Sequence, residues 1–375
     1  MKIPFNRPAK VGREMEYIQD AVDRGHLSGN GYYTKRCHTF FESRYGFPSA
    51  FLTTSGTDAL EMAALLLDLK PGDEVILPSF AFVSTANAFA LRGALPVFAD
   101  SESETPNLDA HAIEPLITPR TRALVPIHYG GVACDMDAIF SVAGKHCLAI
   151  VEDAAQAIDA FYKERPLGSI GHMAAFSFHE TKNVIAGEGG MIVVNDPSRI
   201  ERAEQVWEKG TNRAAFFRGE VRKYEWVHIG SSFLPSELNA AYLWGQLEEL
   251  DRIQKKRFEI WNAYESALKP LEARGKLRLP FIPEYARHNA HIFYLLCSDS
   301  KEKEALIAHL QGKGVHAIFH YLALHKSPYF AQKHDGRPLP NADKWADCLI
   351  RLPLYFDMTE EETEFVVKTI REFYE

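Results

Sequence analysis

Cysteine is scarce in this sequence and never occurs in closely spaced pairs. The five cysteines form an odd number without a CxxC pair, at positions 37, 134, 147, 297 and 348. This pattern argues against a disulfide framework and against a zinc site made of thiolates. We therefore expect the protein to work in a reducing environment, the cytoplasm.

An excess of basic residues and long hydrophobic runs are also missing. The formal net charge is -8 and Lys and Arg are scattered, which argues against a nucleic-acid or anionic-membrane partner. No run approaches the ~20 apolar residues of a membrane-spanning helix, and MKIPFNRPAK lacks the apolar core of a signal peptide. The remaining possibility is an ordinary globular enzyme, because 375 residues can form a large domain and a smaller one.

Short apolar runs alternate with segments of helical periodicity over the first two thirds of the chain. We predict strands at 73–78, 95–100, 122–129 and 148–153, followed by two more at 174–178 and 189–194. Such alternation is typical of a mostly parallel sheet with helices on both faces, the α/β class.

The last third has a different pattern. A long helical stretch from Glu237 to about residue 268 leads into the proline-containing segment KLRLPFIPEY, and we place a domain boundary near residue 250. The predicted domains are residues 1–250 and 251–375. We expect the second to be a small α+β domain with strands at 291–297 and 316–322, a helix at 302–314 and a closing helix from about Thr359.

An acidic residue and a lysine stand out near the end of the large domain. Asp153 ends an apolar strand in VEDAAQ, and Lys182 lies in the loop of FSFHETKNVIAGEGG. Pyridoxal 5'-phosphate (PLP) needs a lysine to hold its aldehyde and an acid to keep its pyridine nitrogen protonated. The alternatives are a helix cap for Asp153 and a solvated loop residue for Lys182, but apolar strands and glycines surround the lysine.

Two segments could bind the phosphate of such a cofactor. Ser55, Gly56 and Thr57 precede a strongly helical run, where backbone N–H groups and hydroxyls would face an anion. Ser177 could donate a further hydrogen bond. The alternative for the first segment is a simple N-cap, which also favours Ser and Thr.

Two residues could contact the ring itself. Phe82, in PSFAFVSTANAF, could stack on a flat heteroaromatic ring, although core packing is the alternative. Gln156 lies three residues after Asp153 and could face the ring or its hydroxyl.

Histidines cluster in the C-terminal third, in NAHIFY and FHYLALH. No carboxylate stands at a ligand spacing, so we predict no metal site. We expect substrate contacts or surface positions instead, with the candidates Arg213, His291, His320, Tyr321 and His325.

Together these segments resemble the DegT/DnrJ/EryC1/StrS sugar aminotransferase family. The motifs that carry the resemblance are SGTDAL, PSFAFVSTANA, VEDAAQ and FSFHETKN, and it extends over nearly the whole chain. In FSFHETKN, EKGTNR (208–213) and IGSSFLPSELNAAYLW (229–244), the chain most resembles the members that make dTDP-4-amino-4,6-dideoxy-D-galactose for enterobacterial common antigen.

The resemblance implies a fold-type I PLP enzyme with a mostly parallel seven-stranded sheet, a homodimer with shared active sites. It implies transfer of an amino group from L-glutamate to the C4 ketone of a nucleotide-linked 4-keto-6-deoxyhexose, with Lys182 as Schiff-base lysine and proton carrier. Ser232 stands where many relatives have an asparagine that reaches the neighbouring subunit's phosphate. Ala81 stands where many have a threonine.

Two alternatives to this reaction remain, one with another sugar substrate and one from a different enzyme class. Other keto nucleotide sugars, 3-keto or UDP-linked, would use the same residues, so nucleotide and hexose rest on the resemblance alone. A nicotinamide-dependent sugar oxidoreductase would need a glycine-rich fingerprint after a strand. The partial match GNGYY (29–33) lacks the third glycine and follows no predicted strand.

Overall fold

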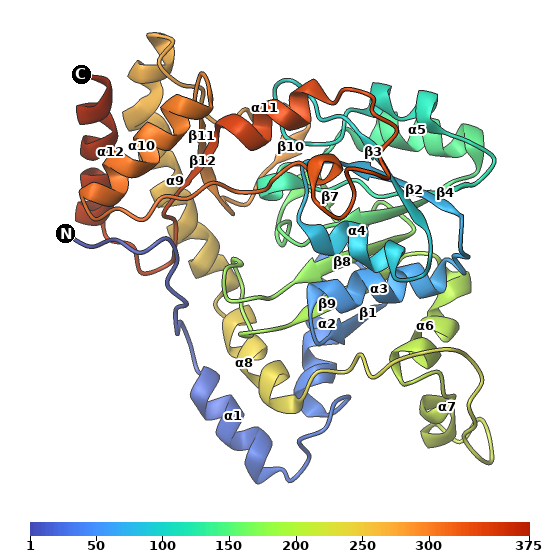
Figure 1. Ribbon diagram of the computed structural model, residues 1–375. Helices are drawn as coiled ribbons and strands as arrows, with labels where there is room; N and C mark the ends of the chain where they lie inside the picture. Colours follow the sequence, from blue (N-terminus) through green and yellow to red (C-terminus); the bar gives the residue numbers. More distant parts are fainter.

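The computed structural model describes residues 1–375 and is built around one seven-stranded sheet with the order β1-β9-β8-β5-β4-β2-β3 (Figure 1). Strand β9 runs antiparallel to both neighbours, and the other pairs are parallel. This confirms the predicted mostly parallel sheet. Its strands are β1 (Ala50–Thr53), β2 (Glu74–Pro78), β3 (Leu95–Ala99), β4 (Thr121–Leu124), β5 (Ala149–Asp153), β8 (Met173–Ser177) and β9 (Gly190–Val194).

Alternate residues of these strands face two separate hydrophobic clusters. In β2, Ile76 belongs to one cluster, whereas Val75 and Leu77 belong to the other. Both faces of the sheet are therefore buried, which explains why its strands read as continuous apolar runs.

Helices cover both faces. The first cluster takes in α2 (Tyr32–Tyr45), α5 (Met136–His146) and α8 (Glu237–Leu247); the second takes in α3 (Gly56–Leu66), α4 (Val83–Ala90) and α6 (Ile200–Trp207). Helix α1 (Glu14–Asp23) packs on α8, and α7 (Arg213–Phe217) lies at the edge of the molecule (Figure 1). Short 3-10 turns occur at Ala110–Ala112, Glu114–Leu116, Tyr129–Gly131, Pro197–Arg199 and Leu324–Lys326.

The C-terminal third forms its own hydrophobic cluster, joined only by Ile3 from the N-terminus. It contains α9 (Leu250–Ala273), α10 (Ser300–Gly312) and α12 (Glu360–Tyr374), together with the two-stranded sheet of β11 (Phe293–Leu296) and β12 (Leu349–Leu352). Helix α11 (Pro340–Cys348) instead packs against the large sheet's second cluster. The boundary at residue 250 stays a prediction.

One expectation for this region holds with an interruption, and one is wrong. The helical stretch predicted from Glu237 forms two helices, α8 and α9, separated at Glu248 and Glu249; α8 packs in the first cluster, and the later turns of α9 pack in the C-terminal cluster. Residues 316–322 are not a strand: only Ile318 pairs there, with Arg351. The strand that pairs with β11 is β12, which we did not predict.

A small three-stranded sheet links the two parts of the chain. Strand β10 (Ala286–Arg287) pairs with β6 (Phe161–Tyr162), and β6 pairs with β7 (Arg165–Pro166). The segment after α9 is thereby held against the large domain. None of the helices combines the length and the apolar character that crossing a bilayer requires.

Candidate active site

Asp153 lies at the carboxyl end of β5, the edge where parallel sheets collect ligand-binding side chains. It is 5% exposed, and its carboxylate accepts hydrogen bonds from the Thr85 hydroxyl (2.6 Å) and the Ala155 N–H (3.1 Å). These two donors fix the orientation of the carboxylate and leave acceptor capacity for a further donor, such as a protonated ring nitrogen.

Lys182 lies in the tight loop between β8 and β9. Backbone hydrogen bonds close this loop, from Phe178 to Gly189, from Glu180 to Gly187 and from Lys182 to His179. Burial lowers the pKa of Lys182 to about 8, although the nearby charge of Asp153 acts in the opposite direction. An amine with this pKa is partly unprotonated near neutral pH and can act as a nucleophile.

The residue next to Lys182 ties its loop to the C-terminal third. The Asn183 amide donates to the Gln254 side chain and to the Asn289 carbonyl (both 2.8 Å), and its oxygen lies 2.8 Å from Nδ1 of His291. His291 is buried, and burial holds its pKa well below the usual value. A neutral His291 therefore positions the lysine loop through Asn183.

The predicted phosphate segments come together. A side chain at Gly56 would place its Cβ 2.9 Å from the Ser177 Cβ, and one at Gly190 would place it 2.3 Å from the Ser55 carbonyl carbon. Only glycine permits this approach of the α3 N-terminus to the ends of β8 and β9. The Thr57 hydroxyl donates to Ser84 (2.8 Å).

The Ser55 side chain is engaged as the N-cap of α3. Its oxygen accepts from the Asp58 N–H at 3.0 Å, which is the N-cap arrangement that we gave as the alternative to a phosphate site. A second use of this hydroxyl, as a phosphate donor, stays a prediction.

Both predicted ring contacts lie beside this edge of the sheet. Phe82 immediately precedes α4 and is 55% exposed, so its ring is free to cover a ligand. The Gln156 oxygen accepts from the Gly130 N–H (2.7 Å), and its nitrogen donates to the Tyr321 hydroxyl (2.8 Å). Gln156 thus links Asp153's segment to the C-terminal third.

His320 and Tyr321 reach the site from the C-terminal third. Their rings stack with centroids 3.6 Å apart, and Nδ1 of His320 lies 2.5 Å from the Tyr129 hydroxyl. Burial lowers the pKa of His320 well below its usual value, and the charges of Arg351 and Lys182 lower it further. His320 is therefore a neutral polar group close to Lys182.

Three other predicted residues lie elsewhere in this chain. His325 is buried against Ser79, with Nδ1 2.7 Å from that hydroxyl. Arg213 and Ser232 are exposed, and Arg213 begins α7 at the molecular edge (Figure 1). A role for Arg213 or Ser232 in an active site would need a second subunit.

Sequence reasoning missed Thr85 and Arg351. Thr85 follows Phe82 by three residues, one helical turn, so both lie at the start of α4. Arg351 interrupts the apolar run of β12, and a charge in a buried strand was the available signal.

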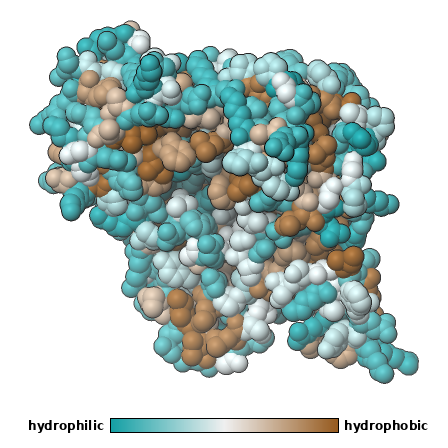
Figure 2. Space-filling view, in the orientation of Figure 1, coloured by the Kyte–Doolittle hydropathy of each residue, from teal (hydrophilic) through white to brown (hydrophobic).

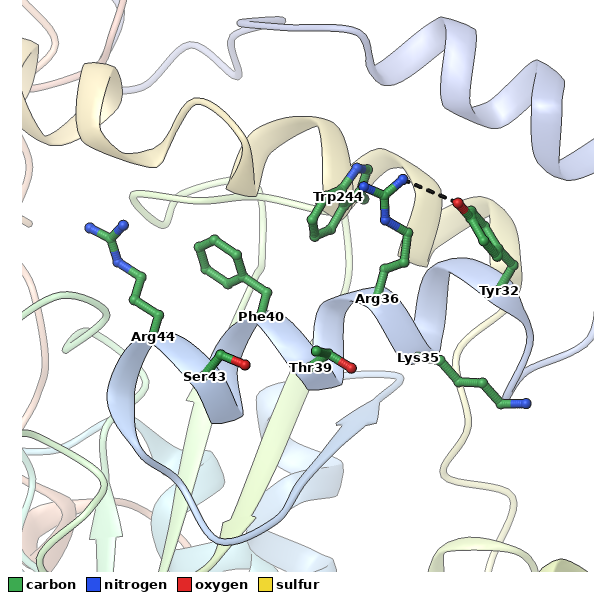
Figure 3. A pocket seen from close by; sticks show the side chains of 8 residues that line it. All are labelled: Tyr32, Lys35, Arg36, Thr39, Phe40, Ser43, Arg44 and Trp244. Atoms are coloured by element: carbon green, nitrogen blue, oxygen red, sulfur yellow. Dashed lines mark hydrogen bonds between the residues drawn. The ribbon is translucent and has the colours of Figure 1, made fainter. Parts of the chain in front are cut away.

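The open groove in Figure 3 contains none of the predicted site residues. It runs along α2 and α8, where Arg36 lies 4.0 Å from the Trp244 ring centroid and donates to the Tyr32 hydroxyl at 3.3 Å. Its lining comprises Tyr32, Lys35, Arg36, Thr39, Phe40, Ser43, Arg44 and Trp244.

The residues around Lys182 fit PLP. The glycine cradle at Gly56 and Gly190 keeps backbone open at a helix N-terminus, where an anion is favoured. The pKa of Lys182 is lowered to about 8, and Asp153 is a buried carboxylate that can accept a further hydrogen bond. Amine, acid and anion site therefore occur around one edge of the sheet.

Comparisons with known proteins identify an aminotransferase family. The sequence matches the DegT/DnrJ/EryC1/StrS aminotransferase family over residues 8–371. It is 34% identical to the spore coat polysaccharide biosynthesis protein SpsC of Bacillus subtilis (strain 168) over 380 residues, 99% of this chain and 96% of that protein.

Solved structures share the fold across the whole chain. The aminotransferase TlmJ from Streptoalloteichus hindustanus has a TM-score of 0.92 at 29% identity, covering 100% of this chain and 99% of that one. Spr1654 from Streptococcus pneumoniae, solved in a PLP form, has a TM-score of 0.91 at 24% identity, covering 100% and 98%. At that identity the second likeness shows the fold alone.

Proposed function

We propose a specific reaction from the premise that this chain belongs to the DegT/DnrJ/EryC1/StrS aminotransferase family, whose members are PLP-dependent. It is a sugar aminotransferase, and we infer that it moves the amino group of L-glutamate to the C4 ketone of a nucleotide-linked 4-keto-6-deoxyhexose. The first candidate substrate is dTDP-4-keto-6-deoxy-D-glucose, which would give dTDP-4-amino-4,6-dideoxy-D-galactose.

The observation that carries amino transfer is Lys182, a lysine with a pKa of about 8 near the buried carboxylate of Asp153. Relatives that dehydrate sugars have a histidine in place of this lysine. The choice of sugar is supported by the resemblance in FSFHETKN and EKGTNR. SpsC, by its name, works in polysaccharide biosynthesis.

When bound, PLP supplies an aldehyde for the amine and an electron-withdrawing ring. Lys182 would hold that aldehyde and afterwards carry a proton on Nζ, which its low pKa permits. Asp153, held by Thr85 and Ala155, would keep the ring nitrogen protonated. Gly56, Thr57 and Ser177 would bind the phosphate, and Phe82 would cover the ring.

An oxidoreductase is less compatible with this chain. The segment GNGYY leads into α2, but the carboxylate of buried Glu237 already accepts from the N–H groups of Gly31, Tyr33 and Thr34. Three N–H groups at the N-terminus of α2 are therefore occupied, and the carboxylate that accepts from them would repel a dinucleotide pyrophosphate.

We also propose a homodimer with shared sites. Apolar side chains are exposed on α1 and just beyond it, at Met15 (55%), Val22 (46%) and Leu27 (45%), and Figure 2 shows hydrophobic side chains at the lower edge where α1 lies. In the segment after α7, Trp226 is 79% exposed. A second copy would cover these surfaces and bring Ser232 and Arg213 to its partner's cofactor and substrate.

The cytoplasm remains the proposed location, since all five cysteines are unpaired thiols.

A panel assay tests the reaction. The PLP-loaded protein is incubated with L-glutamate and with dTDP-linked 4-keto, dTDP-linked 3-keto or UDP-linked 4-keto sugars, and each product is identified by NMR. We expect the dTDP-linked 4-keto sugar to be aminated fastest, with the new amine axial. Faster amination of another sugar would refute the proposed substrate, and hydride transfer with a nicotinamide would refute the class.

A further inference from the structure

One half-buried cation near Lys182 makes no side-chain hydrogen bond in the fold. Arg351 lies in β12, where its backbone N–H donates to the Ile318 carbonyl at 2.7 Å. Its guanidinium covers the Phe5 ring, 4.7 Å from the centroid. A narrow cavity lined by Arg351, His291 and Thr181 joins it to the lysine loop.

The guanidinium has no polar partner. Its Nε is buried without a hydrogen bond, and no carboxylate is among the groups whose charge acts on it. Arg257, which is buried, behaves differently because it donates to the carbonyls of Ala290, His291 and Leu354. Arg257 thus has a structural role that explains its burial, whereas the half-buried Arg351 side chain has no such bonds.

The surroundings of Arg351 are positive or neutral. The positive groups are Lys182 and Arg257, and the charge of Arg351 lowers the pKa of both. His291 is a buried neutral ring and His320 a half-buried one, and Tyr129 and Tyr321 contribute hydroxyls. Since a buried polar group of a cation is costly unless it is paired, the buried and unbonded Nε of Arg351 favours an anion on this side of the site.

We propose that Arg351 binds a carboxylate of the amino-acid donor, and this rests on the proposed function. A guanidinium can hold a carboxylate with two parallel hydrogen bonds. The donor's amino group must come to the position of Lys182, and its α-carboxylate is attached to the same carbon. In a nucleotide sugar the diphosphate is attached at C1, across the ring from the C4 ketone, so its phosphates lie farther from the reacting atoms.

The test measures binding without turnover. Glutarate, a dicarboxylate without an amine, is titrated by calorimetry into the PLP-loaded protein, its Arg351→Met and Arg351→Lys variants, and the control Arg278→Met. Arg278 is a surface arginine paired with Glu104. We expect the glutarate dissociation constant to rise about 10- to 100-fold in Arg351→Met, about tenfold in Arg351→Lys, which keeps the charge but loses the fork, and to stay unchanged in the control.

Kinetics add a second readout. The half-saturation concentration of L-glutamate should rise by a similar factor in Arg351→Met, whereas that of the nucleotide sugar and the affinity for dTDP should not change. Weaker dTDP binding with unchanged glutarate binding would overturn the proposal in favour of a phosphate site. Unchanged binding of both would overturn it outright.

The two proposals fail in distinguishable ways. Glutarate binding is measured without any sugar, so a wrong choice of hexose leaves this test intact. If Arg351→Met does not fold, as judged by circular dichroism, Arg351→Lys decides: glutarate binding equal to that of the unchanged protein refutes the proposal.

Discussion

On the amino-terminal side of the site, the polar groups at and beside Asp153 are hydrogen-bonded: Asp153 accepts from Thr85 and Ala155, and both ends of the Gln156 amide are bonded. On the carboxyl-terminal side, the Arg351 side chain has no such bond. The first arrangement is preorganised for a group that stays bound. The second leaves donors free, and we expect these donors to serve a substrate that binds and leaves rather than a resident cofactor.

The largest expected effect is a complete loss of activity when Lys182, on the amino-terminal side, is replaced. Lys182→Ala should abolish amino transfer, because no other amine lies at this position to hold PLP or carry the proton. Borohydride treatment followed by peptide mass spectrometry should find PLP fixed to Lys182 in the unchanged protein and absent from the variant. The surface variant Lys163→Ala should behave as the unchanged protein, and full turnover in Lys182→Ala would refute the assignment.

Asp153→Asn removes the charge while keeping a side chain of the same shape. Because an amide is a poor partner for a protonated ring nitrogen, we expect the single-turnover rate of 2-oxoglutarate formation from glutamate to fall about 100-fold or more. A rate within about threefold of the unchanged protein would contradict the role of Asp153.

Thr85→Val tests whether orientation of the Asp153 carboxylate matters. Losing one hydrogen bond to a charged acceptor should slow the same step about tenfold. Thr363→Val is the matched control, since that buried hydroxyl bonds only to the Thr359 carbonyl in α12. If both variants retain the full rate, Thr85 has no positioning role.

The smallest effect is a shift of pH dependence. In the PLP-free protein, acetic anhydride should label Lys182 with a midpoint near pH 8, its pKa, because only the unprotonated amine reacts. The negative charge of Asp153 raises the pKa of Lys182, so the midpoint should fall in Asp153→Asn. The positive charge of Arg351 lowers that pKa, so the midpoint should rise in Arg351→Met. Lys163 donates a hydrogen bond to Asp137, which raises the pKa of the lysine, so Lys163 should label only at higher pH. Opposite shifts would contradict the arrangement.

Local sequence was enough for the amino-terminal side. VEDAAQ, SGTDAL and FSFHETKN each end or follow a strand of one parallel sheet, and such strands collect their carboxyl ends at one edge. The alternation of strands and helices therefore placed Asp153, Gly56 and Lys182 near one another without a structure. Ser55 shows the limit of this reasoning, because a helix cap and a phosphate site use the same residue types.

The carboxyl-terminal side depended on contacts between distant segments. His320 and His325 stand in one motif, yet one faces Lys182 and the other is bonded to Ser79. Residues 316–322 pair only at Ile318, so the strand that we predicted there from the apolar pattern does not form.

By itself the sequence determined the sheet and the cofactor class and pointed to Asp153 and Lys182 as the candidate residues for that cofactor, because period-two patterning and strand-end motifs are local properties of the chain. Only the tertiary structure decided that Thr85 orients Asp153, that His291 acts through Asn183, and that Nε of Arg351 is buried without a partner. The two hydrogen bonds join residues 68 and 108 positions apart, and the presence or absence of a partner becomes defined only when packing removes water from the charge.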